Sequence, residues 1–142
     1  MLRWVIATLL VLSVEFGYSS APASAVRSST VTQTGLATYV TQRRDGGQSA
    51  SGEIFQSRQL VAAHRTLPWG SIVRVVNLRN SRAVTVRVID RGPYGRNARH
   101  GAIVDLSRAA ARRLRMIQDG KVLVHLIVVR LGPGTRVRRQ VG

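Results

Sequence analysis

The chain has 142 residues, of which 22 are Lys or Arg and 6 are Asp or Glu, so its formal net charge is +16. It contains no cysteine, which excludes disulfides, a lipidated cysteine and thiolate metal ligands. This length suits one domain with its own hydrophobic core. A basic field of this strength attracts polyanions.

Residues 1–25 have the organisation of a secretory signal peptide. Arg3 gives a positively charged start, residues 4–14 an apolar stretch, and APASA at 21–25 a small-residue cleavage site. The apolar stretch is shorter than the roughly 20 residues that span a bilayer. We predict cleavage near Ala25 and a periplasmic or secreted monomer without a membrane anchor. Export favours anionic wall polymers over nucleic acid as partners of the basic surface, unless the arginines serve solubility alone.

The first half of the mature chain predicts short strands joined by polar turns. A linker at 26–34 precedes a possible strand at 35–40, and the glycine-rich segment 41–52 predicts an exposed loop. A short apolar run at 59–64 leads into the LPWG turn at 67–70. The runs 71–78 and 82–89 are separated by three residues, which predicts a β-hairpin. Alternation in the second run places Val84, Val86 and Val88 on one face.

The second half predicts one helix and one central strand. Ser107 is a suitable N-cap for a helix that begins at Arg108, with Leu106, Ala110 and Leu114 on one side. The β-branched run 122–129 predicts a central strand, and 132–142 a flexible basic tail. Several short strands and one helix favour a small closed β-barrel, although periodicity does not identify which barrel.

Five carboxylates remain after the signal segment. Asp45 and Asp119 are expected in turns, and Asp105, two residues ahead of the N-cap, is expected to satisfy backbone donors at the helix start. Glu53 and Asp90 are left as candidates for chemistry. Asp90 directly follows the strand 82–89 and opens the segment DRGPYG, where turn formation does not require an acid.

The histidines do not form a metal-binding pattern. His100 is expected to be solvated and His125 to lie in a strand, whereas His64 ends an apolar run directly before a turn. No HxxxH or HExxH pair and no phosphate-binding glycine motif occurs, so neither metal nor cofactor is expected. One or two carboxylic acids with an imidazole suit acid–base chemistry on a glycosidic bond, with Tyr94 or Trp69 available to stack on sugars.

Four segments in this order resemble the rare lipoprotein A family: SASGEIF (49–55), LVAAHRTLPWGSIVRVVNL (60–78), VRVIDRGPYG (86–95) and IVDLSRAAARRL (103–114). The resemblance runs from about Gly35 to Leu131. It implies a mainly β fold, a six-stranded double-psi β-barrel with one short helix. It also implies a lytic transglycosylase that cleaves the β-1,4 bond between N-acetylmuramic acid and N-acetylglucosamine in peptidoglycan, leaving 1,6-anhydro ends, in wall remodelling or daughter-cell separation.

The resemblance carries the family's polar residues onto Glu53, His64 and Asp90. Asp90 is the expected general acid, with Glu53 as the alternative acid and otherwise a group that tunes the pKa of Asp90. His64 would orient the carboxylate. The expected substrate-binding residues are Tyr39, Trp69, Arg91 and Tyr94. A non-catalytic, expansin-like module that binds peptidoglycan is the alternative function, because fold alone does not establish activity.

Overall fold

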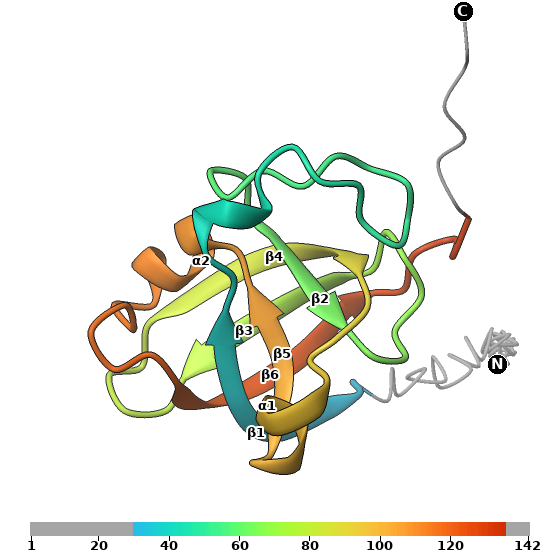
Figure 1. Cartoon of the computed structure of the whole chain (residues 1–142). Coiled ribbons are helices and arrows are strands. Elements are labelled where there is room, and N and C mark those ends of the chain that lie inside the picture. The colour runs from blue at the N-terminus through green and yellow to red at the C-terminus, as the bar shows by residue number, and fades with distance from the viewer. Residues whose placement is uncertain (1–29, 136–142) are drawn as a thin grey trace, which may run out of the picture.

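The computed structural model of the chain describes residues 30–135, so the predicted signal peptide and the tail from residue 136 onward lie outside the described residues. Within them, six strands close into a barrel (Figure 1). The strands are β1 Thr32–Tyr39, β2 Val61–His64, β3 Ile72–Asn77, β4 Ala83–Asp90, β5 Ala102–Leu106 and β6 Val122–Arg130. Their order around the barrel is β1-β5-β2-β4-β3-β6.

The barrel mixes parallel and antiparallel neighbours. The pairs β1–β5 and β2–β4 are parallel, and the other four pairs are antiparallel. The prediction of a six-stranded closed barrel is therefore confirmed. Strand β1 begins at Thr32, inside the segment predicted as a linker, because residues 32–34 pair with residues 125–127 of β6. That partner is 91 or more residues away along the chain, and local composition does not reveal it.

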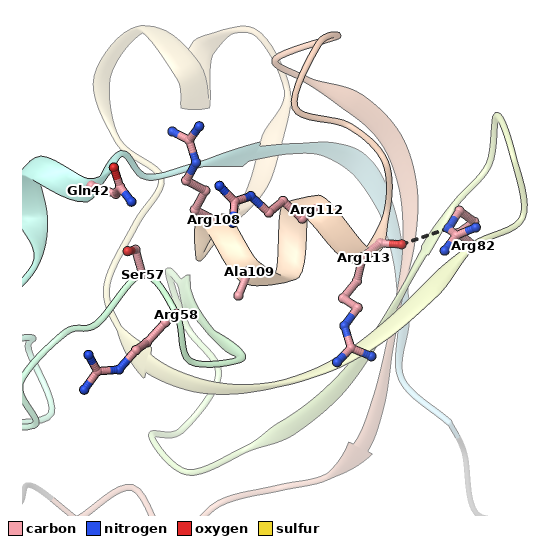
Figure 2. A pocket seen from close by; sticks show the side chains of 8 residues that line it. All are labelled: Gln42, Ser57, Arg58, Arg82, Arg108, Ala109, Arg112 and Arg113. Carbon is pink, nitrogen blue, oxygen red and sulfur yellow. Dashed lines mark hydrogen bonds between the residues drawn. The ribbon is translucent and has the colours of Figure 1, made fainter.

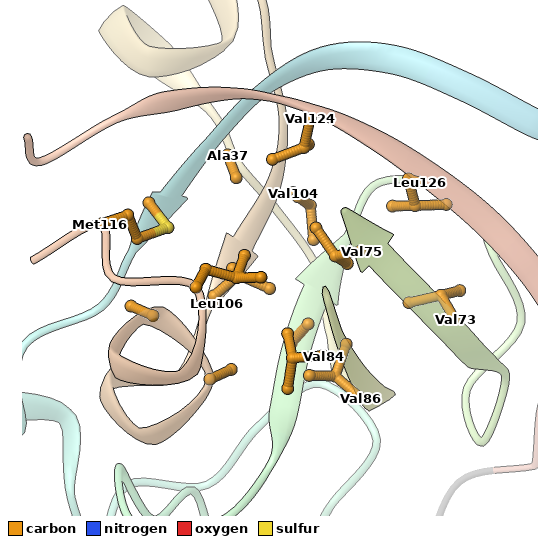
Figure 3. Close-up of a cluster of buried hydrophobic side chains, with 14 of the residues drawn as sticks. Ala37, Val73, Val75, Val84, Val86, Val104, Leu106, Met116, Val124 and Leu126 are labelled. Atoms are coloured by element: carbon orange, nitrogen blue, oxygen red, sulfur yellow. The ribbon is translucent and has the colours of Figure 1, made fainter. Parts of the chain in front are cut away.

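Alternating apolar residues fill the barrel (Figure 3). The predicted hairpin is confirmed as β3 and β4, and Val84, Val86 and Val88 are all buried on the inner face. Strand β6 pairs with both β1 and β3, as expected of a central strand, and its buried and exposed residues alternate from Val122 to Leu126. The barrel interior is thus a packed core without room for a substrate, which must bind on the outer surface.

Helix α2 (Arg108–Arg113) closes one end of the core. The Ser107 side chain accepts a hydrogen bond from the Ala110 N–H at 3.3 Å, which confirms the predicted N-cap. Leu106, Ala110 and Leu114 are fully buried. A second helix, α1 (Gly95–Arg99), and a 3₁₀ turn, η1 (Gln42–Arg44), were not predicted, since three to five polar residues show no periodicity. In residues 30–135 no helix has the length and apolarity that a membrane span needs.

The connection between β1 and β2 arches over one end of the barrel (Figure 1). Residues 41–48 are exposed, as predicted, but Ser49, Ser51 and Gly52 are buried. The loop is fastened to β4, because the Ser51 N–H donates to the Ile89 carbonyl at 3.0 Å and the Ala50 N–H to Asp90 Oδ1 at 2.8 Å. This loop therefore places backbone donors against the end of β4.

Candidate active site

Strand register brings two aspartates together on neighbouring strands. Ala63 of β2 pairs with Asp90 of β4 on one side and with Asp105 of β5 on the other. Asp105 pairs in turn with Thr38 of β1. Adjacent strands lie about 4.8 Å apart, so the two aspartates are roughly 10 Å apart at their Cα atoms, with only a methyl group between them. Register partners share a face of the sheet, and both carboxylates therefore lie in one place.

A small cavity lies at this place, and we call it the acid pocket. Its volume is about 40 Å³, close to the share of one water molecule in the liquid. A sugar ring does not fit inside. A glycan would lie across the mouth and present only its reacting atoms. The lining residues are Val40, Arg44, Phe55, Ala62, Ala63, Asp90, Arg91 and Asp105.

Asp90 is surrounded by hydrogen-bond donors. Its Oδ1 accepts from the Ala50 N–H at 2.8 Å and from its neighbour Arg91 N–H at 2.9 Å, and its Oδ2 forms an ion pair with Arg44 at 3.1 Å. The side chain is 16% exposed. A group that accepts three such bonds is arranged as an anion, since a neutral acid would have to turn its own proton toward a donor.

Asp105 occupies a different environment in the same pocket. Burial raises the pKa of Asp105, and the negative charge of Asp90 raises it further. The hydrogen bond from the Thr38 hydroxyl and the positive charge of Arg44 lower this pKa. Burial is the largest of these effects, and the pKa of Asp105 is raised overall. Asp105 therefore keeps its proton to higher pH than an ordinary aspartate. A carboxyl group whose pKa is raised, next to a second carboxylate surrounded by donors, is an arrangement typical of general acid catalysis.

The prediction that Asp105 serves the helix start is wrong. The Ser107 hydroxyl accepts the hydrogen bond from the Ala110 N–H at the helix start, whereas Asp105 lines the acid pocket. A signal was present in the sequence. Ala102, Val104 and Leu106 alternate in the core, so Asp105 has to lie on the opposite face of its strand. The N-cap Ser107 follows this strand directly, so residues 102–106 resemble the start of a helix unless their alternation is considered.

Glu53 lies outside the acid pocket. Its carboxylate forms an ion pair with Arg87 on the outer face of β4. Its carbonyl accepts a hydrogen bond from the Ser49 N–H at 2.8 Å, inside the loop whose Ala50 N–H binds Asp90. The structure therefore does not bring Glu53 together with Asp90 in one cavity. It connects them through the loop, with Glu53 as one of the points that fix the loop to β4.

His64 is buried and also lies outside the acid pocket. Its Nδ1 accepts from the Thr66 and Leu67 N–H groups at 3.2 and 3.0 Å, which leaves the proton on Nε2, 3.1 Å from Gln33 Oε1. Burial lowers the pKa of His64, and the charges of Arg65 and Arg91 lower it further. A neutral imidazole therefore holds the 64–67 turn, whose His64 and Leu67 carbonyls accept from the Arg91 guanidinium at 3.2 and 2.9 Å.

Of the predicted substrate-binding residues, Arg91 lines the acid pocket, and Tyr94 follows it three residues later without lining the pocket. The Arg91 guanidinium covers the ring of Trp69 at 4.6 Å, so that face of Trp69 does not reach a sugar. Tyr94 is 62% exposed. A Cβ on Gly92 would lie 3.3 Å from Asp105 Oδ2 and 3.9 Å from Tyr94 Cδ2, so Gly92 is near both side chains.

Tyr39 is the fourth of these residues, and it does not reach the acid pocket. It is half-buried against the core, and its hydroxyl donates to the Ile117 carbonyl at 3.2 Å. It lines a separate, open cavity of about 380 Å³. Across residues 30–135, His, Asp and Glu nowhere gather in a group of three or more that could hold a metal ion. The ionisable groups that line the acid pocket are the carboxylates of Asp90 and Asp105 and the guanidinium groups of Arg44 and Arg91.

Comparison with known proteins agrees with this arrangement. The model of the lytic transglycolase family matches residues 32–126. The chain belongs to this family. The endolytic peptidoglycan transglycosylase RlpA of Yersinia pestis is 47% identical over 97 residues, which are 68% of this chain and 26% of that protein. The RlpA protein of Pasteurella multocida is 42% identical over 103 residues, 72% of this chain and 34% of that protein. The double-psi β-barrel expected from the resemblance is confirmed.

The match covers part of these relatives and, in this chain, runs from the start of β1 into β6. This chain spans about a quarter to a third of their length. Among solved structures, Streptomyces papain inhibitor is similar with a TM-score of 0.55 and 27% identity, over 70% of this chain and 96% of that one. An expansin variant of Clavibacter michiganensis in complex with cellohexaose has a TM-score of 0.55 at 19% identity, over 72% of this chain and 54% of that one. At that identity the expansin shares the fold alone.

Proposed function

We propose that this barrel is a peptidoglycan lytic transglycosylase in which Asp105 is the general acid and base and Asp90 the accompanying anion. The observation that carries the proposal is the placement of two carboxylates in unlike environments on either side of Ala63. The family match and the names of the relatives supply the substrate, the glycan strand of peptidoglycan. Because peptidoglycan lies outside the cytoplasmic membrane, the proposal also requires the export that residues 1–25 predict.

The reaction needs no water. Asp105 donates its proton to the glycosidic oxygen, and the bond from that oxygen to C1 of N-acetylmuramic acid breaks, leaving a 4-hydroxyl on N-acetylglucosamine. The 6-hydroxyl oxygen of the same muramic acid then bonds to C1 while the Asp105 carboxylate takes the hydroxyl proton. Asp105 ends protonated, as it began. The Asp90 anion stabilises the positive charge that develops on the sugar ring.

The other predicted catalytic residues become positioning residues in this proposal. Glu53 fixes the loop that binds Asp90, through its pair with Arg87. His64 fixes the turn that binds Arg91. Neither touches the reacting atoms. A variant of either residue should disturb the acid pocket indirectly, by releasing a loop or a turn.

The test of this function is product analysis. The protein from residue 26 onward is incubated with purified sacculi and with amidase-stripped glycan strands, and mass spectrometry looks for 1,6-anhydro-muramic acid ends. New anhydro ends are expected on at least one substrate. If the protein sediments with sacculi and yields no such ends on either substrate, the proposal is overturned, and the expansin-like binding module becomes the better account.

Replacing Tyr94 with Ala should raise KM for glycan strands about ten-fold and leave kcat within about two-fold. An aromatic face beside the acid contributes roughly 0.5–1.5 kcal/mol to such contacts. The melting temperature should not change, because the side chain is mostly exposed. Tyr94→Phe is the matched control and should keep the wild-type KM. A fall in kcat with an unchanged KM would exclude a stacking role for this ring.

A further inference from the structure

Five arginines gather outside the acid pocket, in a cleft beside helix α2 (Figure 2). We call it the arginine cleft, and its volume is about 400 Å³. In Figure 2 the head groups of Arg108 and Arg112 lie on one side of Ala109 and those of Arg58 and Arg113 on the other. An anion in the cleft would therefore meet guanidinium groups from both sides. The arginines that line it are Arg58, Arg82, Arg108, Arg112 and Arg113.

The ion pairs of residues 30–135 do not neutralise these five charges. They use Arg44, Arg79 and Arg87, none of which lines the cleft, and no carboxylate lines it. The nearby carboxylate of Asp45 is already engaged, since its two oxygens accept from the Ser57 N–H at 2.6 Å and the Ser57 hydroxyl at 2.8 Å. Like charges held around one cleft repel one another. An external anion would relieve that repulsion.

Arg108 supplies a second, independent sign of a ligand. Its Nε is buried and makes no hydrogen bond within residues 30–135. A buried donor without a partner is costly, and in a native protein it calls for a specific explanation. An oxygen ligand in the cleft would provide the missing acceptor.

The arrangement of the guanidinium groups favours a phosphate as that ligand. Each guanidinium is a planar fork that matches a carboxylate or a phosphate. The two oxygens of a carboxylate lie in one plane with their carbon, whereas the oxygens of a tetrahedral phosphate accept from forks in several planes. Head groups on both sides of Ala109 therefore suit a phosphate better.

The lining of the cleft also distinguishes among the molecules that carry phosphates. Proteins that lie on a lipid surface insert apolar side chains, and none of the large apolar side chains exposed in residues 30–135 lines the cleft. Single-stranded nucleic acid is held by stacking on aromatic rings, and no aromatic residue lines the cleft. A chain of sugars or polyols joined by phosphodiesters needs neither feature. Such a chain presents charge at regular intervals and nothing that must be stacked or buried.

We propose that the arginine cleft binds a phosphodiester polymer of the cell wall, built from sugar or polyol phosphates, and so holds the barrel at the wall. The inference rests on the proposed function in one respect, the location of the protein outside the cytoplasm. A cleft of about 400 Å³ exceeds what one small ion requires and lies in the range of sites for extended ligands. The turn η1 contributes Gln42 to the cleft and Arg44 to the acid pocket, so the bound polymer lies beside the glycan.

The test measures the affinity of the protein from residue 26 onward for a fluorescent poly(glycerol phosphate) chain by anisotropy. The cleft variant Arg112→Gln/Arg113→Gln is compared with the control Arg74→Gln/Arg130→Gln, which removes the same charge at exposed positions on β3 and β6. The cleft variant should bind about ten-fold more weakly than the wild type, and the control within about two-fold of it. The slope of log Kd against log salt concentration should fall by about one in the cleft variant.

A second pair of variants keeps the charge and changes only the shape of the donor. Arg108→Lys replaces the guanidinium fork by a single ammonium group, and Arg74→Lys makes the same change outside the cleft. Arg108→Lys should weaken binding of poly(glycerol phosphate) about five-fold, because the paired N–H groups are lost. Arg74→Lys should keep the wild-type affinity.

Several results would overturn the inference. Equal weakening in the cleft variant and its control would mean that net charge alone attracts the polymer, and wild-type affinity in Arg108→Lys would remove the fork from the site. Displacement of the probe at equal or lower charge concentration by polyglutamate, a single-stranded oligonucleotide, phosphatidylglycerol vesicles or inorganic phosphate would assign the cleft to that ligand. Anhydro ends on phosphate-free glycan are scored separately. Ends without polymer binding would reject this inference alone, and polymer binding without ends would reject the proposed function alone.

Discussion

Replacement of Asp105 by Asn should reduce the formation of 1,6-anhydro ends by about 100-fold or more, the usual contribution of a general acid. Asparagine keeps the shape of the side chain and an oxygen that accepts from the Thr38 hydroxyl, so the pocket should persist. It has no proton to give to the glycosidic oxygen. Anhydro ends per hour on one batch of sacculi, counted by mass spectrometry, measure the effect. Asp119→Asn is the control, because Asp119 forms a surface ion pair with Arg79.

The same variant separates a catalytic role from a structural one. The folded-state pKa of Asp105 lies above its unfolded value, so the folded protein holds this proton more tightly, and stability falls as pH rises through that range. Asparagine cannot ionise. At pH 7 the melting temperature of Asp105→Asn should therefore equal or exceed that of the wild type. The difference should vanish below about pH 4, where the Asp105 carboxyl is protonated in both the folded and the unfolded wild type. A lost activity accompanied by a lower melting temperature at pH 7 would mean that Asp105 supports the fold.

Much of the fold could be predicted from the sequence because the information is local. Alternation in β4 identified the buried face of Val84, Val86 and Val88, and Ser107 marked the start of α2. The elements that escaped prediction depend on distant partners or are too short for a pattern. Residues 32–34 are a strand because β6 pairs with them, and α1 has only five residues. A closed barrel was predicted from the number of short strands and from the resemblance, and the pairing of β1 with β6 confirms it.

Local sequence patterns predict only part of the candidate site. Asp90 could be found because it ends a strand where a turn does not require an acid. Its partner Asp105 could not be placed without the β5–β2–β4 register, which sets the two acids on either side of Ala63. Glu53 and His64 were chosen by residue type and motif, and both lie outside the acid pocket, Glu53 paired with Arg87 and His64 bonded to the Leu67 N–H. Residue type identifies candidate polar residues, whereas the strand register determines which of their side chains lie close together in the fold.

Register also makes the acid–base pair testable by two substitutions with opposite effects. Asp90 raises the pKa of Asp105 through its negative charge, and Arg44 lowers that pKa through its positive charge. Asp90→Asn should therefore move the titration of Asp105 to lower pH, and Arg44→Gln should move it to higher pH. Because Arg44 also pairs with Asp90, its removal exposes more of the Asp90 charge and acts in the same upward direction.

The measurement is the carboxyl ¹³C chemical shift of Asp105 across the pH range, which does not depend on activity. In kinetic assays, the alkaline limb of the pH–rate profile should move to higher pH in Arg44→Gln, since Asp105 then keeps its proton to higher pH. Asp90→Asn should lose about 100-fold in rate, because the developing sugar cation then lacks its anion. Arg74→Gln, a charge change on the far side of β3, should leave the titration in place. Shifts of the same sign in both variants would mean that Asp90 and Arg44 act on Asp105 through a change of structure and that charge does not couple the pair.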